Sequence, residues 1–243
     1  MYAGNHPNLT ELKSVGVSGM IRGHRGVRAA LAIGLASVLI MLMALLAYWW
    51  LMPATADADS PYVTAETGAP ESTPARAWKK GVVPSLYQTD SHWGSQPYGQ
   101  GTIAAAGAVP TALTMAYVAV TGDQSLTPAD FAAWGSAHDL TATGSDTIKA
   151  YLTDAGADHG LSLKSIALDE HALRRALVAH TPVLVVTQPG TFAPVASVII
   201  LDDIDRNSHL VIHDPTSPSR SAKGWKFDDV INAAAVAYEV HPA

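Results

Sequence analysis

The sequence predicts an α+β domain, and two observations carry this prediction. Signals that start helices dominate the first half of the globular region, whereas short β-rich runs dominate its second half. Helices first and strands later are typical of the α+β class. The chain of 243 residues, 48% of them hydrophobic, is long enough and apolar enough to form the core of such a domain.

Four helices are expected in the first half. Pro110 suits the first turn of a buried helix over 110–120, and Gly122 suits its C-terminal stop. Because a residue before proline favours extended geometry, we expect this helix to begin at Pro110 and not before it. Three further helix starts are indicated by Thr127-Pro128-Ala129-Asp130, by Ser145 ahead of 147–152, and by Asp169-Glu170 ahead of 172–178.

The second half contains three β-rich runs and two closing elements. The runs are predicted to be strands at 183–187, 195–201 and 209–213. A late helix over 227–234 and a last strand over 235–240 follow them. We therefore expect one domain over residues 81–243, with no second domain after it.

An uncharged apolar segment over 29–52 precedes this domain. It is long enough for an α-helix to cross about 30 Å of hydrocarbon, and Tyr48, Trp49 and Trp50 suit an interfacial aromatic belt. Basic residues precede the segment and acidic residues follow it, which indicates a cytoplasmic tail over 1–28 and an extracytoplasmic C-terminal part. The sequence predicts a single-pass protein of the cell membrane.

A cleaved signal peptide is the alternative to a membrane anchor. Ala54-Thr55-Ala56 has the form of a cleavage site, and cleavage near Ala56 would give a secreted protein. The apolar run exceeds the usual signal-peptide length of about 7 to 15 residues, which favours the anchor. Residues 53–80 are rich in Ala, Thr, Ser, Pro and acidic side chains, so a solvated linker is expected there.

Charge and composition exclude several functional classes. A formal net charge of −6 leaves no basic surface of the kind that binds nucleic acid. The absence of cysteine excludes disulfides, thiolate metal sites and a thiol nucleophile. On one strand His209 and His213 would lie roughly 13 Å apart, too far to share a zinc ion whose ligands lie about 2 Å from it. We expect neither a metal nor a cofactor.

Short motifs recur in a characteristic order over residues 86–240. They are Leu86-Tyr87-Gln88-Thr89-Asp90, His92-Trp93-Gly94, Pro97-Tyr98-Gly99, Gly101-Thr102-Ile103, 107–113, Gly144, 198–201 leading to Ile204-Asp205, His213-Asp214-Pro215 and Trp225. In this order they resemble the papain-like C39 peptidase family, in its C39-like branch of secreted and membrane-anchored bacterial proteins. The resemblance implies a papain-like fold with a helical half and an antiparallel β half.

The same resemblance implies that the catalytic residues have been lost. The family's nucleophilic cysteine opens the central helix in a Gly-Cys-Gly-Pro-Thr-Ala-like segment, where this chain has Ala108 followed by Val109. The family's general base is the histidine of a Gly-His pair, where this chain has Ala196-Ser197. Gln88 matches the oxyanion-stabilising glutamine and Asp214 the group that orients the histidine. The chain thus resembles a degenerate member, a pseudopeptidase.

A replacement serine chemistry is the alternative within the same region. Ser197, His209, His213 and Asp214 supply the residue types of an acyl-transfer site. However, Ser197 lies on a predicted strand and lacks the sharp turn that exposes a nucleophilic serine. The sequence therefore supports this alternative poorly.

The resemblance implies a binding module for a peptide, a protein or a cell-wall peptide. Papain-like folds bind extended peptide between their helical and β-rich halves, and such a cleft can outlast its nucleophile. Here it is expected to be lined by Gln88, Ala108, Val109, Ser197 and Asp214. Two alternatives remain open: a structural or assembly role with a filled cleft, and a hydrolase with altered chemistry.

Overall fold

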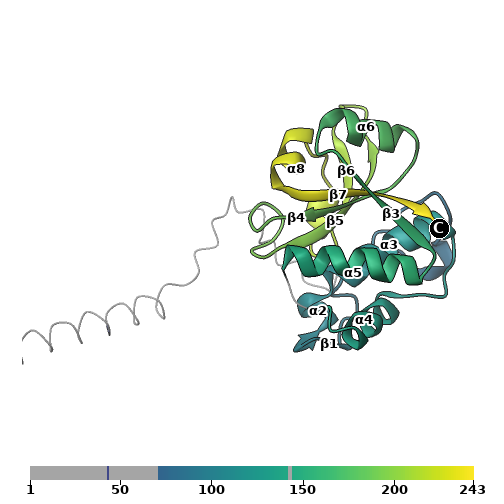
Figure 1. Ribbon diagram of the computed structural model, residues 1–243, viewed down its shortest axis with the longest axis vertical. Helices are drawn as coiled ribbons and strands as arrows, with labels where there is room; N and C mark the ends of the chain where they lie inside the picture. Colours follow the sequence, from purple (N-terminus) through teal and green to yellow (C-terminus); the bar gives the residue numbers. More distant parts are fainter. Residues whose placement is uncertain (1–42, 44–70, 142–143) are drawn as a thin grey trace, which may run out of the picture. The chain divides into compact units, whose positions relative to one another are not determined.

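A five-stranded antiparallel sheet is the centre of the computed structural model, which describes Met43 and residues 71–141 and 144–243 (Figure 1). Helices pack on both faces of this antiparallel sheet, and the combination of helices with an antiparallel sheet confirms the predicted α+β class. The predicted cytoplasmic tail, the predicted membrane segment apart from Met43, and most of the predicted linker lie outside the described residues. No helix in the described ranges combines the length and the apolar character needed to cross a membrane.

The strands are arranged in the order β3-β7-β4-β5-β6, and all neighbouring pairs are antiparallel. Their bounds are β3 Leu161–Ile166, β4 Val183–Thr187, β5 Ser197–Ile204, β6 Leu210–His213 and β7 Ala234–Pro242. A separate two-stranded sheet pairs β1 (Pro97–Tyr98) with β2 (Gly101–Thr102). The three predicted β-rich runs and the predicted last strand thus form four neighbouring strands of one sheet. The sequence patterns do not predict β3.

The helices vary from a single turn to four turns. Their bounds are η2 Ala75–Ala77, α2 Ile103–Ala106, α3 Ala108–Thr121, α4 Pro128–Ala137, α5 Ser145–Asp158, α6 Glu170–Val178, α7 Pro218–Ser221 and α8 Phe227–Ala233. The predicted starts of α4 and α6 are confirmed by their caps: Thr127 and Asp130 form a capping box, and Asp169 accepts a hydrogen bond from the Ala172 amide.

The central helix α3 is buried along nearly its whole length, with every residue over 108–120 shielded from solvent. It begins at Ala108, two residues earlier than predicted. Pro110 is the third residue of the helix, where its missing N–H removes no intrahelical hydrogen bond. Gly122 ends the helix in the left-handed conformation at φ 76°, as its position in the sequence predicts, and its amide donates to the Val118 carbonyl.

The two faces of the sheet bury two separate apolar clusters. On β5, Val198 and Ile200 belong to the cluster around α3, α4 and α5, whereas Ile199 and Leu201 belong to the cluster under α6 and α8. Strand residues alternate between faces, so β4, β5 and β7 contribute to both clusters, whereas the buried residues of β6, Leu210 and Ile212, belong to the cluster under α6 and α8. Figure 1 shows α6 and α8 on one side of the sheet and α3 and α5 on the other.

The segment over 71–90 packs against the α3 side of the domain. Thr73 and Ser85 are joined twice, since the Thr73 amide donates to the Ser85 carbonyl at 2.8 Å and the Ser85 amide donates to Thr73 Oγ1 at 3.0 Å. The indole of Trp78 is 4% exposed and donates to the Thr73 carbonyl. Residues 71–80, which composition assigns to a linker, thus contribute a buried tryptophan to the core.

Asp90 stabilises the start of the segment over 71–90. Its carboxylate accepts hydrogen bonds from the backbone amides of Ser72 and His92 and lies 2.7 Å from His92 Nδ1. Burial alone would raise the pKa of Asp90, but the hydrogen bonds from His92 and Ser72 outweigh it and hold the pKa below its ordinary value. The ionised carboxylate is therefore the form that the folded state prefers.

This preference predicts a pH dependence of stability. Because the folded-state pKa of Asp90 is lowered, its stabilisation is fully present above the unfolded pKa of about 3.9 and is lost as pH falls through the folded value. Urea denaturation between about pH 5 and pH 2 is expected to show a shallower slope of unfolding free energy against pH in Asp90→Asn than in the wild type. The exposed carboxylate variant Asp154→Asn serves as the control, and equal slopes in the two variants would contradict the prediction.

Candidate functional site

Ala108 stands at the N-terminus of α3, directly after Gly107. It is 9% exposed, and its neighbour Val109 is 8% exposed. Gly107 tolerates no side chain, because a Cβ there would lie 2.5 Å from the Ile103 carbonyl oxygen and 2.4 Å from Ile103 Cγ2. The tight junction between α2 and α3 thus places a methyl group where the resemblance expects a thiol.

Gln88 joins this junction to the loop that follows β6. Its backbone amide donates to the Pro215 carbonyl at 2.9 Å, and its side-chain Nε2 donates to the Ala104 carbonyl of α2 at 2.9 Å. The side-chain oxygen Oε1 is buried and has no hydrogen-bond partner among the described residues. Gln88 is therefore held beside the start of α3 with one unsatisfied acceptor.

A second unsatisfied polar atom lies in α3. Thr111 is fully buried, and its hydroxyl has no partner in the described part of the chain. Residues three positions apart on a helix share a face, so Thr111 lies one turn beyond Ala108 on the same side. Thr187 Oγ1 on β4 is buried and without a described partner as well.

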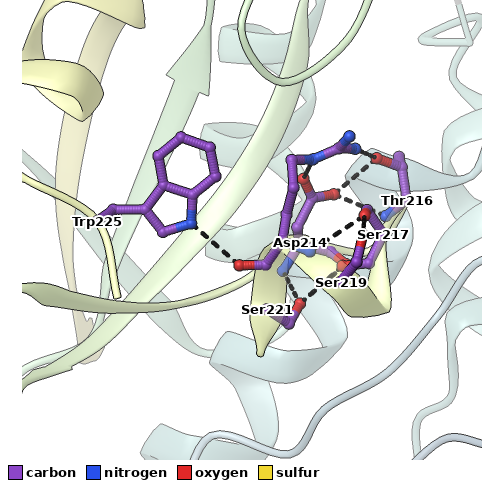
Figure 2. Close-up of polar contacts among 7 residues, drawn as sticks. Asp214, Thr216, Ser217, Ser219, Ser221 and Trp225 are labelled. Carbon is purple, nitrogen blue, oxygen red and sulfur yellow. Dashed lines mark hydrogen bonds and ion pairs between the residues drawn. The ribbon is translucent and has the colours of Figure 1, made fainter. Parts of the chain in front are cut away.

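Asp214 is 1% exposed and is bound on both of its oxygens (Figure 2). Oδ2 accepts from Arg220 Nε at 2.6 Å, and Oδ1 accepts from the amide and the hydroxyl of Thr216 at 2.8 and 2.7 Å. The guanidinium of Arg220 also donates to Thr216 Oγ1 at 2.6 Å, and Arg220 is itself 4% exposed. The carboxylate is thus a buried partner of an arginine on the short helix α7.

Ser197 opens β5 and is 4% exposed. It pairs in register with Thr187 on β4. Strand alternation places its side chain on the face of Ile199, which is the α6 side, whereas α3 packs against the face of Val198. Gln88 thus joins α2, the helix before Ala108, to the loop after Asp214, whereas Ser197 is directed toward the other face of the sheet.

The two histidines of the β6 region have other partners than Ser197 and Asp214. His209 Nδ1 lies 3.8 Å from Asp205 Oδ2. His213 Nδ1 lies 3.0 Å from Ser85 Oγ, and its Nε2 lies 3.4 Å from Asp202 Oδ2. The serine beside His213 is thus one that sequence reasoning missed, because 128 residues separate the two and no local signal links them.

The remaining clusters of ionisable side chains offer no further candidate. Within the described ranges no group of three or more histidine, aspartate or glutamate side chains could hold a metal ion. The hydrogen bond from the His209 amide, aided by the one from Asn207, lowers the pKa of the Asp205 carboxyl below its ordinary value, although burial acts in the opposite direction. These hydrogen bonds connect residues within one turn of the chain, and they stabilise that turn.

The candidate site consists of the junction of α2 and α3, Gln88 and the loop at Asp214. It lacks a nucleophile at Ala108, the position where the resemblance expects one. Comparisons of the chain with protein-family models, with curated proteins and with solved structures found no match. The resemblance to papain-like C39 peptidases therefore rests on the order of the sequence motifs and stays a prediction.

Proposed function

We propose that this chain is a membrane-anchored pseudopeptidase of the papain-like C39 type. Its anchor is the segment over 29–52, and its extracytoplasmic domain binds a peptide, a protein or a cell-wall peptide without cleaving it. The binding site is the former cleft beside the N-terminus of α3. The proposal needs neither a cofactor nor a metal.

The lack of cleavage is supported by the three positions that match the family's triad. The methyl group of Ala108 cannot attack a carbonyl, and Ser197 is directed to the face opposite α3. Both oxygens of Asp214 are bound by Arg220 and Thr216, so the carboxylate already serves a buried arginine and not an imidazole. Loss of the nucleophile or the base of a triad reduces kcat by a factor on the order of 10⁶.

The observation that carries the binding proposal is the pair of unsatisfied groups beside Ala108. Buried polar atoms in native proteins are nearly always hydrogen-bonded, so each exception requires an explanation. Gln88 Oε1 is able to accept a hydrogen bond, and Thr111 Oγ1 is able both to accept and to donate one, but neither has a partner among the described residues. The amide groups of an extended peptide supply the matching donors and acceptors.

A second function, an assembly role with a filled cleft, is favoured by a different observation. Ala108, Val109, Ser197 and Asp214 are each less than one-tenth exposed. If neighbouring side chains fill the cleft, a partner would bind on another face of the domain. The two functions differ in what the space beside Ala108 contains.

Ala108→Trp distinguishes the two functions. In an open cleft the indole occupies the space of the ligand, so binding is lost while the free energy of unfolding falls by less than about 1 kcal/mol. In a filled cleft the same indole overpacks the core and lowers the free energy of unfolding by about 1–3 kcal/mol or more. We expect the first result, measured by calorimetric titration with peptides and peptidoglycan fragments and by urea denaturation of the full-length chain.

An exposed alanine of α4 gives a matched control, because Ala133→Trp adds the same indole on a solvent-facing surface. It is expected to leave both binding and stability unchanged. Failure of the wild type to bind any of these probes, together with strong destabilisation by Ala108→Trp, would contradict the binding proposal and support the assembly role.

A further inference from the structure

A serine, a histidine and an aspartate form a chain of polar contacts at the edge strand β6. Ser85 Oγ is 3.0 Å from His213 Nδ1, and His213 Nε2 is 3.4 Å from Asp202 Oδ2. A nucleophile within hydrogen-bond reach of a base, with the base held by a third group, is the geometric signature of an activated nucleophile. None of the functions considered above uses Ser85 or Asp202.

Each of the three side chains is placed by a defined feature of the fold. His213 is the last residue of β6. The pairing of β5 with β6 passes from Leu201–Ile212 to Asp203–Val211, which leaves Asp202 as the extra residue of a β-bulge. Such bulges re-aim side chains and are over-represented next to active sites.

Ser85 comes from a different part of the fold, the segment over 71–90, and backbone contacts of that segment hold it in place. The double connection between Thr73 and Ser85 fixes the backbone of Ser85 over the end of β6. The backbone amide of Gln88 then bonds to the Pro215 carbonyl, so residues 85–88 follow the chain over 213–215. Ser85 is thus positioned by backbone contacts on both sides and not by its contact with His213 alone.

The three side chains are partly open to solvent. The side chain of His213 is 14% exposed and that of Asp202 is 33% exposed, while Ser85 is half-buried. A base that is largely shielded, with its nucleophile partly accessible, allows a small substrate to approach and limits competition from water. An acyl-transfer role requires the tautomer in which Nε2 carries the proton toward Asp202 and the lone pair of Nδ1 faces the Ser85 hydroxyl.

We propose that Ser85 is the nucleophile and His213 the general base of an acyl-transfer site, with Asp202 as the positioning residue of the imidazole. The substrate class is a carboxylic ester or amide. This site is distinct from the thiol-peptidase position at Ala108, and the inference does not depend on the proposed binding function.

The chemical step needs only the substrate and water. Ser85 Oγ forms a bond to the carbonyl carbon while its proton passes to His213 Nδ1. The imidazolium then protonates the leaving alcohol or amine as the carbonyl C–O or C–N bond breaks, which leaves an acyl group on Ser85. Water attacks this ester, His213 takes the proton and returns it to Ser85 Oγ, and the carboxylic acid is released.

A fluorophosphonate probe tests the nucleophile without knowledge of the natural substrate. It forms an Oγ–P bond to an activated serine and releases fluoride. On the full-length chain we expect one adduct, assigned to Ser85 by peptide mass spectrometry and absent in Ser85→Ala. His213→Gln is expected to slow labelling by about 100-fold or more, because a general base contributes factors of 10² to 10⁴.

Three further variants test the positioning residue and supply a control. Asp202→Asn is expected to slow labelling, and Asp202→Glu to restore part of the rate, which a purely structural role of Asp202 would not produce. Ser91→Ala removes an exposed serine that directly follows the segment over 71–90 and is expected to leave labelling unchanged. No adduct on the folded wild type, or an adduct that persists in Ser85→Ala, overturns the proposal.

The absence of cysteine allows a second test that does not require Ser85→Ala to fold. Ser85→Cys introduces the only thiol of the chain, and a neighbouring imidazole lowers the pKa of a thiol and raises its reactivity. We expect iodoacetamide to alkylate it about 10-fold or more faster at pH 7 than the thiol of Ser91→Cys. An equal rate, or a rate that His213→Gln does not change, shows that the contact is structural and overturns the proposal.

Discussion

Arg220→Ala is expected to lower the free energy of unfolding by about 3–5 kcal/mol. The guanidinium and Asp214 form an ion pair at 2.6 Å, and the two side chains are 5% and 1% exposed. Removal of the arginine leaves a carboxylate buried without its charged partner, which costs far more than the loss of a surface ion pair. Urea denaturation measures the difference.

Two comparisons isolate the cause of this effect. The exposed Arg206→Ala, on the turn before β6, is expected to change stability by less than about 0.5 kcal/mol. The double variant Asp214→Asn with Arg220→Met removes both charges, and we expect it to be more stable than Arg220→Ala alone. If Arg220→Ala costs no more than Arg206→Ala, Asp214 does not depend on the arginine, and the argument that it cannot orient a histidine loses its support.

Trp78→Ala is expected to lower the free energy of unfolding by about 3–5 kcal/mol. The indole is 4% exposed within the cluster around α3, its Nε1 donates to Thr73, and the Trp78 carbonyl accepts from Gln124 Nε2. The substitution creates a cavity at the base of the segment that carries Ser85. Chemical denaturation of the full-length chain is again the measurement.

Two control variants accompany this prediction. Trp78→Phe keeps most of the apolar volume and removes the hydrogen bond, so a smaller loss of about 1 kcal/mol is expected from the bond itself. Lys79→Ala changes an exposed neighbour and is expected to have little effect. If Trp78→Ala has as little effect as Lys79→Ala, residues 71–80 behave as the solvated linker that their composition predicts.

The elements that sequence could predict are those whose signals are local. The run over 183–187 became β4 with the same bounds, because five consecutive apolar or β-branched residues are buried on both faces. The helix starts at Thr127 and Asp169 were found through their caps, which depend on contacts within one turn. Gly122 was found as a helix stop because few residues other than glycine adopt its conformation.

The parts that sequence could not predict depend on contacts between distant residues. β3 is a half-exposed edge strand with two serines and a lysine, and it becomes a strand by pairing with β7. The ion pair of Asp214 depends on α7, a single turn that returns Arg220 to the carboxylate. The Ser85–His213 contact joins the N-terminal segment to the far edge of the sheet, so neither residue carries a local signal of the other.

The position of β7 has a consequence for how this domain forms during synthesis. β7 follows all the other strands in the chain, yet it lies between β3 and β4 in the sheet. On a ribosome that has not yet reached residue 234, β3 has no partner strand and β4 is paired on one side only. Domains generally fold as units, and distant strand pairings are slow to form. The sheet therefore closes only after residue 242 has been synthesised, and until then the apolar edge of β4 must be kept from other chains.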